Sequence, residues 1–198
     1  MQSYAETAVD LLWIPLGAGA SVPIVAWNGR LYEALQSARE RRPRAQLFHA
    51  ALEILLDGHA HVVEMTPAWG QAHSSAGAVS SGPVGLRALG RSRLFRYEVH
   101  CWRDGVIPDR GFAVGGATRL SEDRRHAERI LARAASAPCH VWGRDELGAG
   151  EMWNSNSLVA WLLADASVPL DGVRPPAGGR APGWAAGIAA ATGGGLGG

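Results

Sequence analysis

The sequence predicts an α+β fold, in which a small antiparallel sheet packs against helices, on three observations. Residues 46–65 contain two apolar segments joined by the turn dipeptide Asp57-Gly58, a pattern that predicts a β-hairpin. Residues 93–102 alternate between polar and apolar side chains, as a half-buried strand does. Residues 153–165 begin with short polar side chains that favour a helix N-terminus and continue with apolar residues at helical spacing.

Length and composition favour one globular domain. The chain has 198 residues, of which 47% are hydrophobic, and this is enough for one sizeable core. We assign residues 1–170 to a single domain and residues 171–198 to a Gly/Pro/Ala-rich C-terminal tail. The last seven residues of this tail are rich in glycine and are expected to be disordered.

The charge and residue usage exclude several kinds of function. A formal net charge of +1 gives no overall field that would attract nucleic acid or an anionic membrane. All 19 basic residues are arginine, so lysine Schiff-base chemistry and a Walker lysine are excluded. Cys101 and Cys139 are too few for a disulfide scaffold or a Cys-rich zinc site, and a reduced, cytoplasmic location is the simplest inference.

Residues 11–27 form an apolar run that resembles a membrane or targeting segment only in composition. A signal peptide requires a Lys or Arg before its apolar segment, and none precedes this run. Pro15 and Pro23 also interrupt it. The run is also short for a transmembrane span. We therefore predict a buried strand and turn, with no transmembrane segment.

The N-terminal half is predicted to contain a strand, a helix and the hairpin. Residues 8–16 are expected to form the first strand, and residues 28–42 a helix that Pro43 ends. In the hairpin, a two-residue turn places His49 opposite Thr66, so that Glu64 becomes a diagonal neighbour of His49 on the same face. A loop with an odd number of residues would bring His61 to that position instead.

The C-terminal half is predicted to be less regular before its last helix. Residues 69–92 are rich in Gly, Ser and Ala and are expected to form a mobile loop. After the strand at 93–102, residues 112–114 are expected to add a short strand. A capped helix is predicted over residues 121–136, and residues 143–150 are expected to lead flexibly into the helix near Trp153.

Three polar residues on these elements have the chemistry of covalent acyl transfer. A histidine that accepts a proton, a carboxylate that orients its ring and a hydroxyl nucleophile are supplied by His49, Glu64 and Ser155. Each residue also has an ordinary structural explanation, respectively as a hydrogen-bonded core histidine, a surface carboxylate and a helix cap. From the sequence alone, both interpretations stay open.

A resemblance to a known family connects these residues. Residues 48–54 and 62–65, with the Asp57-Gly58 turn between them, resemble the paired-strand motif of the papain-like NlpC-type superfamily in its circularly permuted form, to which lecithin:retinol acyltransferase belongs. Residues 154–159 resemble the late Asn-Cys element at the start of a helix in that family. Bacterial families of unknown function with an Asn-Ser-Asn run at the same point are also similar.

The resemblance implies a permuted papain-like fold and a role for each residue. His49 would be the general base, Glu64 or alternatively His61 the orienting group, and Ser155 the nucleophile. The family nucleophile is a cysteine, so Ser155 would have to lose its proton to His49 during attack. Cys101 lies on the expected buried face of its strand, and Cys139 lies on an extended segment beside His140; neither is favoured as the nucleophile.

The predicted function is therefore a hydrolase or acyltransferase that acts on an amide or ester. Asn154, Asn156 and Ser157 are expected to cap the helix or bind the substrate, which would be a small molecule, a lipid or a peptide. No cofactor is expected, and no metal, because His59 and His61 lack a third ligand at suitable spacing. The alternative is a catalytically inactive binding or scaffold module that retains the same fold.

Overall fold

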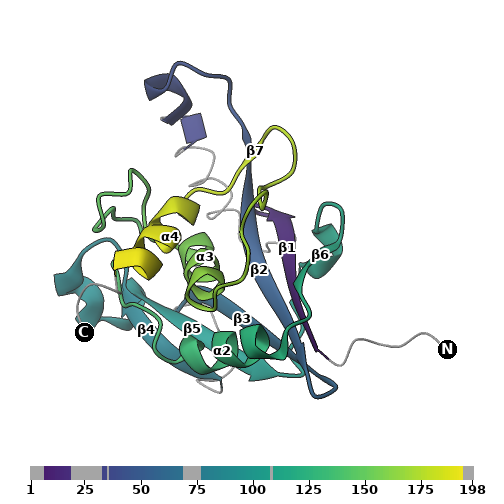
Figure 1. The fold of residues 1–198 in the computed structure, drawn as a ribbon. Coiled ribbons are helices and arrows are strands. Elements are labelled where there is room, and N and C mark those ends of the chain that lie inside the picture. Colours follow the sequence, from purple (N-terminus) through teal and green to yellow (C-terminus); the bar gives the residue numbers. More distant parts are fainter. Residues whose placement is uncertain (1–6, 19–32, 35, 69–76, 108, 194–198) are drawn as a thin grey trace.

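A computed structural model describes residues 7–18, 33–34, 36–68, 77–107 and 109–193, and it has an α+β fold, as predicted (Figure 1). The strands are β1 (Thr7–Pro15), β2 (Gln46–Leu56), β3 (His59–Pro67), β4 (Ala78–Pro83), β5 (Arg96–Arg103), β6 (Ala117–Ser121) and β7 (Gly179–Arg180). The helices are α2 (Arg124–Ala134), α3 (Ser155–Asp165) and α4 (Trp184–Gly193), with 3-10 turns η1 (Arg87–Arg91), η2 (Arg93–Phe95) and η3 (Arg110–Phe112).

The described strands form one twisted sheet in the order β4-β5-β3-β2-β1-β6, with β7 paired to β2. All neighbours along this path are antiparallel, whereas the short β7 runs parallel to β2. The sheet is therefore larger than the small one expected. None of the described helices is long and apolar enough to cross a membrane.

The β2–β3 hairpin has the predicted register. Its ladder runs from the Leu56–His59 pair to the Leu52–Val63 pair. Both turn residues have positive φ, 53° at Asp57 and 76° at Gly58, as the tight hairpin turns favoured by Asp-Gly require. The sequence predicts this register correctly because the turn residues and the alternation along the strands indicate the same strand pairing.

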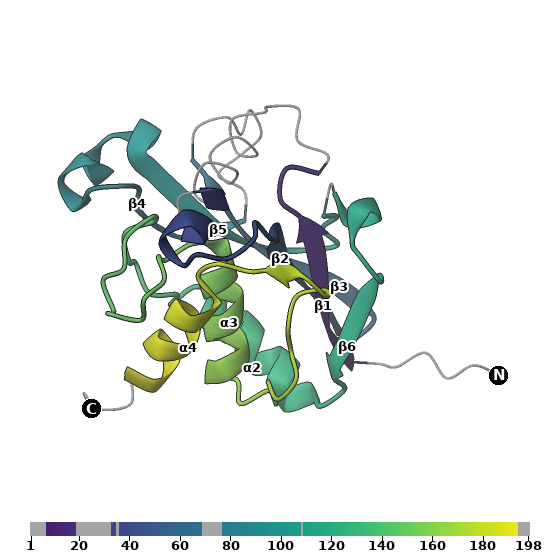
Figure 2. The same cartoon turned by 90° about the horizontal axis from the view of Figure 1, so that it is seen from above.

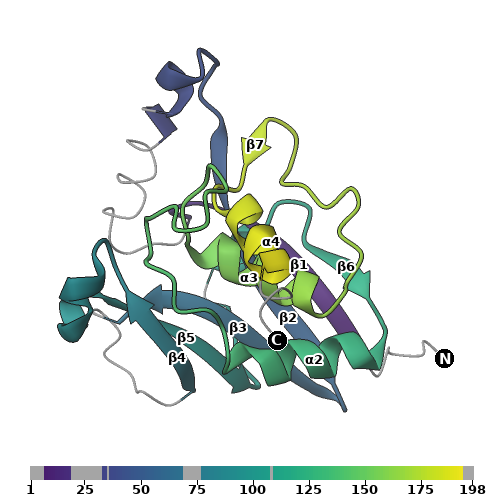
Figure 3. The ribbon, with the colours of Figure 1, turned by 60° about the vertical axis from the view of Figure 1, so that its left-hand side comes forward.

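The helices α2, α3 and α4 cover one face of the sheet (Figures 2 and 3). The larger core lies between these helices and the sheet. Helix α3 is at its centre, because all residues of α3 from Leu158 to Leu163 are buried. On the opposite face of the sheet, a smaller apolar cluster includes Leu12, Ile14, Ala51 and Val62. Alternation along β1 and β2 decides which side chains join which core.

The C-terminal segment is packed into the domain as far as Gly193. Helix α4 lies against α3, and a Cβ atom at Gly187 would come within 2.2 Å of the Ser157 carbonyl oxygen. Only glycine allows this close helix contact. Of the Gly/Pro/Ala-rich segment predicted as a tail, residues 179–193 thus contribute β7 and α4, and residues 194–198 lie outside the described part.

Two predictions in the middle of the chain were wrong. Residues 78–83, predicted as part of a loop, form β4, where Gly82 packs so closely on Tyr97 that a Cβ atom would lie 2.3 Å from the tyrosine hydroxyl. Because most residues of this edge strand are small, its sequence lacks the alternation of apolar and polar side chains that is typical of a strand. Residues 112–114 form no strand, because Phe112 ends the 3-10 turn η3 and residues 113–114 are irregular, and the strand lies at β6 instead.

The two outer predicted helices have different outcomes. The helix expected over residues 121–136 is confirmed as α2, whose N-cap Asp123 accepts a hydrogen bond from the Arg125 N–H. Of the helix expected over residues 28–42, residues 33–34 and 36–39 are helical, and residues 28–32 and 35 lie outside the described residues.

Candidate active site

The structure brings Ser155 and His49 together across 106 positions of the sequence. Ser155 is the first residue of α3, and its Oγ lies 2.9 Å from Nδ1 of His49 on β2. Both residues are partly exposed. A hydroxyl and an imidazole nitrogen at this distance share a hydrogen bond.

The contact exists because the start of α3 fills a gap beside β2. The β2–β3 ladder ends at Leu52, and farther along β2 the Asn156 side chain takes the position of a strand partner. Its Oδ1 accepts a hydrogen bond from the Ala50 N–H at 2.7 Å, and its Nδ2 donates to the Phe48 carbonyl oxygen at 3.0 Å. His49 lies between the two residues that Asn156 binds, so Asn156 places Ser155 against it.

The other polar residues of the motif close the helix end. The Asn154 side chain accepts hydrogen bonds from the Asn156 and Ser157 N–H groups, and Ser157 Oγ accepts one from the Asn154 N–H. This reciprocal arrangement is a capping box. Because Asn156 and Ser157 are also buried, the structure uses both for capping and positioning, and leaves Ser155 as the partly exposed hydroxyl.

The C-terminal segment holds the same helix end from the other side. Ser157 Oγ donates to the Gly183 carbonyl oxygen at 2.7 Å, and the Asn154 and Asn156 side-chain amides both donate to the Pro182 carbonyl oxygen. Gly183 has a φ of +94°, and a Cβ atom there would lie 2.3 Å from Asn154 Oδ1. Glycine is therefore required at this position.

Glu64 lies on the same face of the sheet as His49 but is not its hydrogen-bond partner within the described chain. On β3 it alternates with Val63 and Met65, which face the larger core, and its cross-strand neighbour on β5 is His100. Burial, together with the negative charge of Asp109, raises the pKa of Glu64 to about 7. His61 shares the opposite face with Val63 and Met65, which separates it from His49.

Asp109 is the acidic residue whose charge acts on His49. Burial lowers the pKa of His49 below its ordinary value, and the Asp109 carboxylate opposes this shift. At neutral pH His49 is therefore uncharged and able to accept a proton. No periodic pattern in the sequence indicates that the loop around Asp109 approaches the histidine.

A second Ser–His pair provides an internal reference. Ser121 Oγ lies 2.8 Å from Nδ1 of His126, but the two residues are only five positions apart at the start of α2. Ser121 Oγ also accepts a hydrogen bond from the Asp123 N–H at 3.0 Å, as in a local turn at a helix start. A short Ser–His distance alone is therefore not specific to one site in this chain.

Neither cysteine joins the site. Cys101 packs against the larger core, where burial raises the pKa of its thiol. Cys139 is exposed and contacts Ser80 Oγ and the Ala137 carbonyl oxygen, both at 3.7 Å. Over the described ranges, no three His, Cys, Asp or Glu side chains lie close enough together to hold a metal ion.

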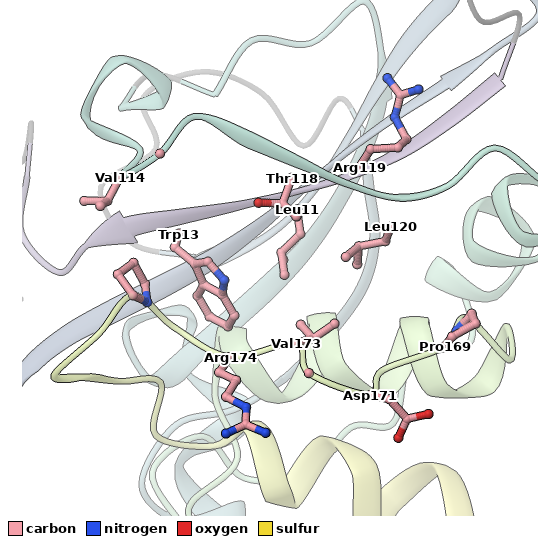
Figure 4. A pocket seen from close by; sticks show the side chains of 13 residues that line it. Leu11, Trp13, Val114, Thr118, Arg119, Leu120, Pro169, Asp171, Val173 and Arg174 are labelled. Atoms are coloured by element: carbon pink, nitrogen blue, oxygen red, sulfur yellow. The ribbon is translucent and has the colours of Figure 1, made fainter.

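The cavity shown in Figure 4 lies elsewhere, between β1, β6 and the segment after α3. Its volume is about 610 Å³, and its lining includes Leu11, Trp13, Leu120 and Val173. Leu11 and Trp13 belong to the larger core, on the helix-covered face, whereas His49 lies on the opposite face with Ala51. Neither His49 nor Ser155 lines this cavity.

Fold and site together describe an α+β protein with a Ser–His dyad at the N-terminus of a buried helix. No protein-family model, curated protein or solved structure matches the chain. The geometry of the dyad and of the residues that support it is therefore the basis for assigning a function.

Proposed function

We propose that the protein is a hydrolase or acyltransferase that acts on an amide or ester, with Ser155 as nucleophile and His49 as general base. The observation that carries the proposal is the 2.9 Å contact between Ser155 Oγ and His49 Nδ1, built from two distant segments. The resemblance to the permuted papain-like superfamily supports the same two roles. We also place the protein in the bacterial cytoplasm on the basis of that resemblance and the low cysteine content.

In this mechanism the hydroxyl of Ser155 attacks the substrate carbonyl carbon while its proton passes to His49 Nδ1. The tautomer with the proton on Nε2 leaves Nδ1 free to accept, and the lowered pKa keeps the ring neutral beforehand. The protonated ring then gives its proton to the leaving amine or alcohol. A water or acceptor alcohol releases the acyl group in the second half of the reaction.

The start of α3 supplies the positive end of a helix dipole at the developing oxyanion. Asn154 already occupies the N–H groups of Asn156 and Ser157, which leaves the Ser155 N–H as the first-turn donor for the oxyanion. Glu64 and Asp109 are the two candidate carboxyl groups for stabilising the protonated imidazole. Of these two, Asp109 acts on the pKa of His49.

The test is labelling with a fluorophosphonate probe, which reacts with activated serine hydroxyls. We expect labelling of the wild-type protein and its loss in Ser155→Ala, with Ser121→Ala as the matched control that removes a second His-bonded serine of the described chain. Labelling that persists in Ser155→Ala would refute Ser155 as the nucleophile.

A catalytically inactive binding module is the second candidate. It is favoured by one observation: no hydrogen bond joins His49 to a carboxylate within the part of the chain that the structure describes, so the third member of a triad is not in place. Absence of labelling in the wild-type protein, together with a folded chain, would favour this candidate.

A further inference from the structure

The segment from Leu86 to Phe95 is unusually exposed for its composition. It contains the 3-10 turns η1 and η2, neither of which has a buried residue. Four large apolar side chains in it are exposed, namely Leu86 (50%), Leu89 (40%), Leu94 (65%) and Phe95 (41%). Exposed apolar residues that gather on one short segment commonly mark an interaction surface.

The segment is a compact projection. Its ends are joined by a hydrogen bond from the Val84 N–H to the Phe95 carbonyl oxygen at 2.8 Å, and further backbone bonds close the two turns inside it. Gly90 lies so close to Pro83 that a Cβ atom would be 2.8 Å from the proline Cβ. In all three views the segment lies at the periphery of the molecule beyond β4 (Figures 1, 2 and 3).

Its charge is entirely positive. Arg87, Arg91, Arg93 and Arg96 lie between Val84 and Tyr97, and no acidic residue does. Arg87 is paired with Glu146, and Arg96 donates to Ser81 Oγ. Arg91 and Arg93 are exposed and form no ion pair with the residues that the structure describes. The local charge therefore differs from the nearly neutral chain as a whole.

We propose that residues 86–95 dock the protein on an anionic lipid bilayer, with the four apolar side chains inserted at the interface and Arg91 and Arg93 contacting lipid headgroups. Leucine and phenylalanine next to arginine suit the boundary between acyl chains and acidic headgroups. This surface is independent of the Ser155–His49 dyad.

Two other occupants fit less well. A symmetric dimer through this segment would bring the arginines of one copy against those of the other, which opposes association. Nucleic acid would use aromatic rings for stacking, and Phe95 is the segment's only aromatic residue. The apolar side chains would then remain exposed.

The test is co-sedimentation of the full chain with vesicles of phosphatidylcholine, either pure or containing phosphatidylserine. We expect binding to the mixed vesicles, weaker binding to the pure ones and a decline with added salt. Arg91→Gln combined with Arg93→Gln should weaken binding about 30-fold. Leu94→Ser combined with Phe95→Ser should weaken it roughly tenfold or more.

Matched controls use exposed residues elsewhere, namely Arg174→Gln for the charge and Val106→Ser with Phe112→Ser for the apolar area. These should bind like wild type, as should Ser155→Ala. The proposal is overturned if the wild-type protein does not bind the mixed vesicles or binds both vesicle types equally. It is overturned too if the protein binds single-stranded RNA and not the vesicles. It is also overturned if the control variants lose binding as strongly as the segment variants.

Discussion

Two Ser–His pairs among the described residues have nearly the same hydrogen-bond length but different surroundings. The Ser155–His49 pair measures 2.9 Å and joins a buried helix to a strand, whereas the Ser121–His126 pair measures 2.8 Å within one helix start. Ser121 Oγ also accepts a backbone N–H, while Ser155 Oγ has no second bond to a described residue. Distance therefore identifies a contact, and the surroundings determine what the contact can do.

The position of the serine relative to its helix is the difference that matters. Ser155 is the first residue of α3, where the helix dipole favours developing negative charge, and Ser121 precedes the N-cap of α2. Burial lowers the pKa of His49, which keeps it in the form that accepts a proton. The comparison makes Ser121 and His126 natural controls for each residue of the proposed site.

The largest expected difference between the pairs is in the rate of serine labelling. Replacing the base by His49→Ala should slow fluorophosphonate labelling about 10³-fold, because a general base contributes a factor of this order. His126→Ala should leave the rate unchanged. Labelling rates of both variants, measured on protein shown to be folded by circular dichroism, test this. Equal effects of the two substitutions would remove the distinction between the pairs.

The second expected difference is in stability, through the buried support of the dyad. Asn156→Ala removes three side-chain hydrogen bonds and leaves the Ala50 N–H and Phe48 carbonyl oxygen without their partner. We expect the free energy of unfolding to fall by about 3 kcal/mol, measured by urea denaturation.

The corresponding support of the other pair is an exposed cap. Asp123→Ala, which removes the N-cap side chain of α2, should cost about 1 kcal/mol. A loss in Asn156→Ala no greater than that in Asp123→Ala would contradict the role assigned to the buried amide.

How much of this site the sequence could predict depends on whether each signal is local. The hairpin register and the α3 cap followed from Asp57-Gly58 and Asn154, because turn and cap preferences act within a few residues. The amide bridge from Asn156 to β2 links residues more than 100 positions apart, and nothing in its local pattern distinguishes it from a cap.

Other parts of the fold had no usable sequence signal. The alanine- and glycine-rich residues of α4 resemble a flexible tail, although small size is what lets Gly187 approach α3. The edge strand β4 has small side chains without clear alternation. Asp109 reaches the site from an irregular loop, where no periodicity predicts direction.

The third expected difference is a pH dependence of the folding stability, which Glu64 contributes near the Ser155–His49 pair. The folded pKa of Glu64 is about 7, above its ordinary value of 4.5, so between these values the folded state keeps a proton that the unfolded chain releases. This contribution to stability is fully present below pH 4.5 and is lost as the pH rises to about 7.

Glu64→Gln should therefore be more stable than wild type at pH 8 by about 3 kcal/mol and differ little at pH 4.5, since the amide cannot ionise. Urea denaturation at both pH values measures this difference. Glu122→Gln, at an exposed position next to Ser121, is the matched control for the loss of a carboxylate. A Glu64→Gln difference that is the same at both pH values would contradict the raised pKa.

The smallest expected difference concerns a thiol placed at each serine position. In Ser155→Cys, the helix N-terminus should lower the pKa of the new thiol, whereas in Ser121→Cys the thiol precedes the helix cap. At pH 6.5 we expect the thiol at position 155 to react with iodoacetamide about tenfold faster, since more of it is thiolate. Peptide mass spectrometry separates these sites from Cys101 and Cys139. Adding His49→Ala to Ser155→Cys distinguishes the two sources of activation: a rate that remains high would assign it to the helix end, and a rate that falls to that of position 121 would assign it to the histidine.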